Sequence, residues 1–276
     1  MRDLIERIER LKVDLAKLRF SDEDILPIDL QRSRDIELTY TSNAIEGNTL
    51  TLDQTKSLIE RGTTAPGKKM IEHQEIIDHH NALEWVKKTA RNEDPIDDKT
   101  VLHLHELTMK TSRSDIAGRY AQYPRRISGM NVIFPNHLKV PTLMNELGDK
   151  LLDSDGSPAA AFDAHHRIVS IHPFDDGNGR TARLLMNLML LRNGYTPVAV
   201  SPEDRQEYID SINKAQMKGD ENAPEFQQFM HRQLARTMQE YVDDLGQETE
   251  LIQEPKKKPL TPAQMAFMQN KGGIDR

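Results

Sequence analysis

The sequence predicts an all-α protein, a helical bundle interrupted by one short β-hairpin. Along most of the chain, aliphatic residues recur at spacings of three and four, as on the buried face of an amphipathic helix. Glycine and proline residues divide this pattern into pieces of helical length. Residues 112–140 differ, because glycines and prolines are frequent there and β-branched and aromatic residues cluster between them.

Five helices are expected in the first half of the chain. The first has its aliphatic side chains on one face: Leu4, Ile8, Leu11, Leu15 and Leu18. After a break at Pro27, the second covers residues 30–45 and ends at Gly47 and Asn48. Three further helices are expected at residues 51–60, 69–91 and 97–110, separated by Gly62 and by a polar run.

The second half begins with the expected hairpin at residues 127–135. Its strand character comes from Ile127, Val132, Ile133 and Phe134. Helices are then expected at residues 141–153, 158–170 and 180–192, with an irregular loop at 171–179.

Another helix is expected to start at Ser201, because a serine cap followed by Pro202 is a typical first turn. The last long helix carries an apolar face formed by Phe226, Met230, Leu234, Met238, Tyr241 and Leu245. Residues 246–276 are polar and are expected to form a linker and a tail.

Composition restricts the classes of function. The 276 residues include 37 Lys and Arg against 44 Asp and Glu, and this net charge of -7 disfavours a general nucleic-acid binder. There is no cysteine, which excludes disulfides, thiolate metal sites and cysteine nucleophiles within this chain. No apolar leader or membrane-length stretch is present, so a soluble, cytoplasmic protein without a membrane partner is expected.

The most informative segment is IHPFDDGNGRTAR, residues 171–183. Gly177 and Gly179 flank Asn178 at a predicted helix start, where backbone N–H groups and the helix dipole favour a phosphate. Arg180 and Arg183 project from the same face of the first turn and suit two successive phosphates.

Two side chains near these glycines are suited to catalysis. Asp176 can hold a Mg²⁺ ion that the phosphates complete. His172 can take a proton from an incoming hydroxyl group.

Other interpretations of these residues are weaker. A Ca²⁺ loop needs a bidentate acid eleven residues on, where this chain has Met186 and Asn187. The doublets His79–His80 and His165–His166 could suggest a metal phosphohydrolase, but a histidine pair in a helical protein is more often packed or exposed.

The string HPFDDGNGRTAR matches the pattern HPFx(D/E)GNGRxxR of the Fic (filamentation induced by cAMP) family without departures. The resemblance covers about residues 36–245, which would form the Fic domain, preceded by an N-terminal helical segment at 1–35 and followed by the tail. It implies a protein adenylyltransferase that moves AMP from ATP to a Ser, Thr or Tyr hydroxyl of a target protein. Transfer of another nucleotide is an alternative.

The resemblance also implies roles for single residues. His172 would be the general base, Phe174 a buried anchor of the loop, and Asp176 the ligand of Mg²⁺ or Mn²⁺. Gly177, Asn178 and Gly179 would surround the α- and β-phosphates. Arg180 would bind the β-phosphate and Arg183 the γ-phosphate.

The segment TSNAIEGN, residues 41–48, resembles the (S/T)xxxE(G/N) motif of autoinhibited Fic proteins that carry the inhibitory helix in the same chain. Ser42, Glu46 and Gly47 match the motif. Ser42 and Glu46 are four residues apart and therefore share a helix face. The resemblance implies that Glu46, on an inhibitory helix at about 36–47, pairs with Arg183 in the γ-phosphate position.

Three questions stay open at this level. Residues 127–135 are either a target-docking flap, which would bind the target backbone by β-augmentation, or a structural hairpin. Some Fic proteins remove AMP instead, and here Glu46 and His172 would then both be catalytic. The N-terminal helix is expected to pack on the core, with a homodimer as the alternative.

Overall fold

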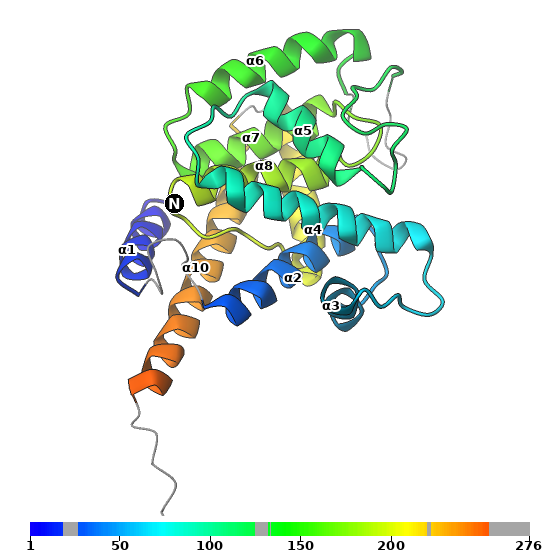
Figure 1. The fold of residues 1–276 in the computed structure, drawn as a ribbon. Helices are drawn as coiled ribbons and strands as arrows, with labels where there is room; N and C mark the ends of the chain where they lie inside the picture. The colour runs from blue at the N-terminus through cyan, green and yellow to red at the C-terminus, as the bar shows by residue number, and fades with distance from the viewer. Residues whose placement is uncertain (19–26, 125–131, 133, 220–221, 254–276) are drawn as a thin grey trace, which may run out of the picture.

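The computed structural model describes residues 1–18, 27–124, 132, 134–219 and 222–253, and these residues form helices and loops without a strand. The all-α prediction is confirmed (Figure 1). The elements are α1 (Arg2–Leu18), α2 (Ile28–Ile45), α3 (Leu52–Arg61), α4 (Met70–Ala90), α5 (Asp98–Thr108), η1 (His137–Lys139), α6 (Val140–Leu152), α7 (Pro158–Ile171), α8 (Asn178–Arg192), η2 (Pro202–Asp204), α9 (Arg205–Lys218) and α10 (Pro224–Gln253). Within the described ranges, no helix is both long enough and apolar enough to cross a membrane.

Local signals explain where many helices begin and end. Thr51 caps α3 by accepting a hydrogen bond from the backbone N–H of Gln54, and Gly62 ends this helix with φ 66°. Ser201 accepts from the backbone N–H of Asp204 with Pro202 at the first position, so the expected start is confirmed. These contacts are local in sequence, which is why the helix boundaries could be predicted closely.

Helix α8 lies at the centre of the core and packs against α7, α4 and α5 (Figure 1). From Asn178 to Leu190, all residues except Gly179 are buried. The apolar surface of this helix is interrupted by Asn187, whose side chain accepts from the N–H and donates to the carbonyl of Val198. This pairing satisfies a buried amide and holds the chain after α8 against the helix.

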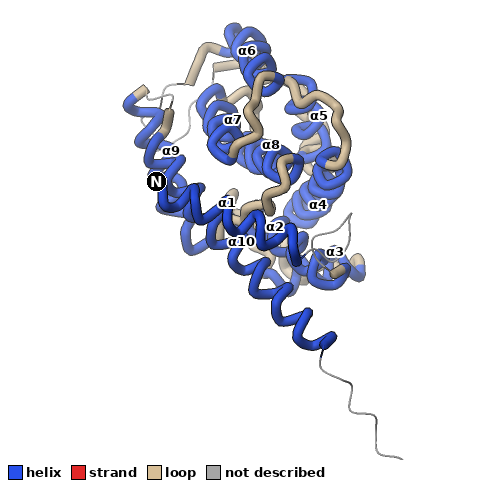
Figure 2. The backbone as a smooth tube through the Cα atoms, turned by 90° about the vertical axis from the view of Figure 1, so that its left-hand side faces the viewer, coloured by secondary structure: helices blue, strands red, loops and turns tan. Residues whose placement is uncertain are grey.

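Helix α1 packs along α10 within the same chain (Figure 2). Its buried side chains Ile8, Leu11 and Leu15 belong to the main hydrophobic core. The expected intramolecular packing is therefore confirmed, and the homodimer alternative stays a prediction.

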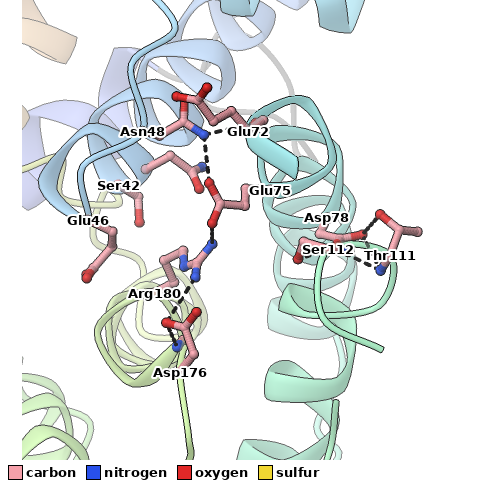
Figure 3. A network of polar contacts seen from close by, with 12 residues as sticks. Ser42, Glu46, Asn48, Glu72, Glu75, Asp78, Thr111, Ser112, Asp176 and Arg180 are labelled. Carbon is pink, nitrogen blue, oxygen red and sulfur yellow. Dashed lines mark hydrogen bonds and ion pairs between the residues drawn. The ribbon is translucent and has the colours of Figure 1, made fainter. Parts of the chain in front are cut away.

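Helix α4 is joined to the segment after α5 by one buried carboxylate. Asp78, which is 1% exposed, accepts hydrogen bonds from the backbone N–H and hydroxyl groups of both Thr111 and Ser112 (Figure 3). These bonds fix α5 relative to α4, so the side chains that the two helices direct at the start of α8 are held in place.

The predicted hairpin at residues 127–135 differs from the described structure. Val132 and Phe134 lie in a loop, so their predicted strand conformation is wrong. Phe134 is instead buried against the end of α7, because burial of its ring outweighs a strand propensity that is weak without a paired neighbour. Ile127 and Ile133 lie outside the described residues.

Candidate active site

His172 stands at the point where α7 ends. Pro173 disfavours right-handed helical geometry at the preceding residue, so the helix stops there. His172 takes a left-handed conformation, φ 52° and ψ 57°, which is uncommon for a residue other than glycine. Its imidazole stacks on the ring of Phe134 with the centroids 4.2 Å apart. The stacking therefore holds the imidazole against Phe134 at the end of α7.

Phe174 anchors the loop, as expected, because it is completely buried. Its ring stacks on His105 of α5 with the centroids 3.7 Å apart. Nδ1 of His105 accepts the backbone N–H of Gly118, so the proton of the neutral ring is on Nε2, which donates to the carbonyl of Asp176. Burial lowers the pKa of His105 to about 4, against which the hydrogen bond to Asp176 acts. A neutral histidine therefore holds the loop.

The side chain of Asn178 closes the same loop. Its Oδ1 accepts the N–H of Phe174 and its Nδ2 donates to the carbonyl of Phe174, both at 2.9 Å. The predicted contribution of Asn178 to an anion site is therefore restricted to its backbone N–H. Gly177 caps α8 with φ 75°, and a Cβ there would lie 2.7 Å from Sδ of Met109.

The N-terminus of α8 is next to an acidic side chain. The first N–H groups of a helix have no acceptor within the helix and favour an anion. A Cβ on Gly179 would collide with Oε1 of Glu46, so the carboxylate lies directly against this glycine. Glycine at this position therefore leaves room for an anionic group at the helix start.

Arg183 is held by α2 and α9. Nε donates to Oγ of Ser42 at 2.9 Å, Nη2 donates to the Ser42 carbonyl at 2.8 Å and to Oε1 of Glu46 at 2.7 Å, and Nη1 donates to the hydroxyl of Tyr208 at 3.3 Å. Burial alone would lower the pKa of Arg183, but Tyr208 and Glu46 raise it above its usual value. The predicted contact between Glu46 and Arg183 is present.

Tyr208 is itself supported by a buried histidine. Its hydroxyl lies 2.7 Å from Nε2 of His165. Burial, and secondarily the charge of Arg183, lower the pKa of His165 well below its usual value, so this ring is neutral. The Tyr208 hydroxyl thus accepts a hydrogen bond from Arg183 without adding a charge to the site.

Arg180 contacts two other carboxylates, those of Glu75 and Asp176 (Figure 3). Its side chain is 2% exposed, with Nη1 3.3 Å from Oε1 of Glu75 and Nη2 3.4 Å from Oδ1 of Asp176. Oδ1 of Asp176 also accepts the N–H of Gly177. The two arginines therefore present separate charged groups at the start of α8, each already paired with an acid.

The residues present fit a magnesium ion of the kind that phosphates complete. In the described part of the chain, no group of three or more His, Asp or Glu residues could hold a metal ion. Asp176 is a single carboxylate, 46% exposed, two residues before the first residue of α8. Mg²⁺ in nucleotide sites is commonly held by one or two carboxylates together with phosphates and water.

Three residues of the site could not be identified from the sequence: Glu75, His105 and Tyr208. They lie on α4, α5 and α9. His105 contacts the loop, whereas Glu75 and Tyr208 contact Arg180 and Arg183 of α8, and all three contacts depend on helix packing. The sequence carries no local motif around any of them. By contrast, Ser42, Glu46 and the loop residues were found because each belongs to a short motif.

Comparison with known proteins assigns the site to a known family. Residues 95–190 match the family model described as Fic/DOC family. A protein from Nematostella vectensis named protein adenylyltransferase Fic is 36% identical over 208 residues, which are 74% of this chain and 48% of that protein. The chain thus spans less than half of the length of that relative.

Two solved structures share the fold. Residues 134–508 of Fic-1 from C. elegans superpose with a TM-score of 0.76 at 30% identity, covering 88% of this chain and 71% of that chain. A Fic domain containing signaling protein from Bacteroides thetaiotaomicron gives a TM-score of 0.76 at 26% identity, covering 87% of this chain and 97% of that chain. The similarity therefore extends well beyond the residues of the loop.

Proposed function

Because this chain belongs to the Fic/DOC family, we propose that it transfers AMP from ATP to a hydroxyl group of a target protein. Relatives named protein adenylyltransferase support the reaction. The observation that carries the proposal is the position of Glu46, whose carboxylate lies at the N-terminus of α8 and binds Arg183. A site that accepts one anion between a helix start and a guanidinium is suited to a phosphate.

The triphosphate is bound by the start of α8 in this proposal. The backbone N–H groups at residues 177–179 surround the α- and β-phosphates. Arg180 binds the β-phosphate and Arg183 the γ-phosphate, each replacing a carboxylate partner by a phosphate oxygen. Asp176 would hold Mg²⁺ or Mn²⁺, and such an ion would supply neutralisation of charge on the phosphates.

His172 acts as the general base. Its imidazole takes the proton of the target hydroxyl while the hydroxyl oxygen forms a bond to the α-phosphorus. The bond between that phosphorus and the oxygen leading to the β-phosphate breaks, and pyrophosphate leaves. Phe134 orients the imidazole through the stacking contact of 4.2 Å.

Glu46 inhibits the reaction by occupying the γ-phosphate position. Because its carboxylate is bound to Arg183, ATP can be held only with its phosphates displaced from the geometry needed for attack. Ser42 strengthens this state by accepting two hydrogen bonds from Arg183, one on its hydroxyl and one on its carbonyl. In this proposal the protein target docks at residues 127–135, of which Phe134 stacks on His172 at the end of α7 and Val132 lines a pocket together with Ser170 and Ile171.

Labelled ATP tests the proposal. With Mg²⁺ or Mn²⁺, Glu46→Gly is expected to increase AMP incorporation into the protein itself, and His172→Ala in the same background is expected to abolish it. Absence of label on the Glu46→Gly protein would contradict the transferase assignment. Loss of AMP from a modified protein only while Glu46 is intact would instead identify the hydrolytic reaction. A thermal-shift comparison of ATP, GTP and UTP determines the base preference.

A further inference from the structure

We propose that Glu75 is a positioning residue that holds the guanidinium of Arg180 in place for the nucleotide phosphates, and that Asn48 holds Glu75. This inference rests on the proposed function, because it concerns the same phosphate site. It assigns a role to two residues outside the active-site loop. One of them, Asn48, is the last residue of the TSNAIEGN segment at 41–48, here called the inhibitory segment, and lies two residues after Glu46.

Arg180 needs a fixed counter-charge. Its side chain is 2% exposed, and neither Nε nor Nη1 has a hydrogen-bond partner among the residues that the structure describes. A buried guanidinium without an opposite charge is strongly unfavourable. Among the described residues, the carboxylates in ion-pair contact with it are Glu75 at 3.3 Å and Asp176 at 3.4 Å.

These two carboxylates differ in how firmly they are held. Asp176 is 46% exposed and would turn towards a cation when the nucleotide binds. Glu75 is 21% exposed, and its Oε2 accepts a hydrogen bond of 2.9 Å from Nδ2 of Asn48 (Figure 3). Glu75 is therefore the counter-charge that remains on Arg180 while Asp176 is engaged.

The amide of Asn48 has only one satisfactory orientation. Nδ2 donates to Oε2 of Glu75 and to the carbonyl of Glu72, while Oδ1 accepts the N–H of Leu50. Exchanging the amide oxygen and nitrogen would bring two acceptors together at Glu75 and two donors together at Leu50. This network joins the inhibitory segment to α4 and orients Glu75 towards α8.

A consequence is that substitutions of Glu46 and Asn48, two residues apart, have opposite effects on AMP transfer. Loss of Glu46 removes a competitor of the γ-phosphate and increases transfer. Loss of Asn48 releases Glu75, leaves Arg180 less ordered and weakens nucleotide binding. Relief of inhibition therefore moves the Glu46 side chain and leaves Asn48 in place.

The test measures Mg-ATP binding by calorimetry in a Glu46→Gly, His172→Ala background, where the inhibitory carboxylate and turnover are both absent. Glu75→Ala is expected to raise Kd about tenfold, since it removes a charged partner of Arg180. Glu75→Gln keeps the size of the side chain but removes the counter-charge, and is expected to raise Kd nearly as much. Asn48→Ala leaves the charge in place but releases Glu75, and is expected to raise Kd by less than Glu75→Ala. In the Glu46→Gly background alone, the change is expected in KM for ATP, with kcat retained.

Glu72→Gln is the matched control. Glu72 lies on the same helix and binds the same segment through Thr49, but it has no ion-pair contact with Arg180. It is expected to leave Kd unchanged. An unchanged or lower Kd in Glu75→Ala would overturn the inference. If the Glu75→Ala protein does not fold, the Asn48→Ala protein provides the test. An unchanged Kd for Mg-ATP in Asn48→Ala would then overturn the inference. Failure of the background protein to bind Mg-ATP would instead refute the proposed function.

Discussion

Oε1 of Glu46 lies 2.7 Å from Nη2 of Arg183, although the two residues are 137 positions apart in the chain. The pair is buried on one side only, since the Arg183 side chain is 4% exposed and the Glu46 side chain 38%. Arg183 keeps Ser42 and Tyr208 as acceptors when the pair opens. Glu46 can therefore leave towards solvent at a modest cost while the arginine stays in position for a phosphate.

The charge of Glu46 is expected to determine most of the inhibition. Glu46→Gly removes the whole contact and is expected to raise AMP incorporation about 5- to 150-fold, the range of a typical coupling between two competing states. Glu46→Gln keeps an acceptor for Nη2 without the charge and is expected to give an intermediate rate. Initial rates with labelled ATP measure both. A Glu46→Gln rate no higher than that of the unmodified protein would show that the carboxylate charge is unimportant.

The hydroxyl of Tyr208 is expected to stabilise the fold. Tyr208→Phe leaves Nη1 of the buried Arg183 and Nε2 of His165 without this partner. The free energy of unfolding is expected to fall by about 1–3 kcal/mol, the cost of unsatisfied buried polar groups. Urea unfolding measures this difference. Tyr123→Phe is the control, because Tyr123 is 71% exposed and its change is expected to have little effect.

Phe134 is expected to affect the chemical step. Phe134→Ala removes the ring against which His172 stacks, so the imidazole loses its fixed orientation. In the Glu46→Gly background, kcat is expected to fall about tenfold or more, since general-base catalysis depends on position. Mg-ATP affinity is expected to remain unchanged. Leu138→Ala, at a side chain 77% exposed, serves as the control for this part of the chain.

His105 is expected to make stability depend on pH. Its pKa is lowered from 6.5 to about 4 in the folded protein, chiefly by burial, so the unfolded chain binds a proton between these values that the folded chain does not. Its contribution is complete above about pH 6.5 and is lost as the pH falls towards 4.

Urea unfolding checks this linkage. The loss assigned to His105 between pH 7.5 and 5 is about 2 kcal/mol. His105→Gln is expected to lower the pH dependence by this amount, whatever its effect on stability at pH 7.5. His79 and His165 are buried with lowered pKa values as well, so part of the dependence is expected to remain. An unchanged dependence in the variant would contradict the neutral His105.

Helix boundaries followed from the sequence because caps and breaks act over a few residues. Thr51, Gly62, Ser201 and Pro202 mark helix ends in the sequence and again in the structure. The hairpin assignment failed at Val132 and Phe134, which lie in a loop, since strand propensity is weak and depends on the packing around each residue. The conformation of a short apolar segment such as this one is decided by the side chains that pack against it.

By itself, the sequence determined the helical architecture and the active-site loop, because Pro173, Gly177 and Asn178 set the backbone through contacts within a few residues. Only the tertiary structure decided that Glu75 pairs with Arg180, that Tyr208 binds Arg183 and that His105 supports the loop. Periodicity tells which face of a helix is buried, but not which helix lies opposite. His105 reaches the loop, and Glu75 and Tyr208 reach the arginines of α8, from three separate helices, and such contacts arise only when the helices pack together.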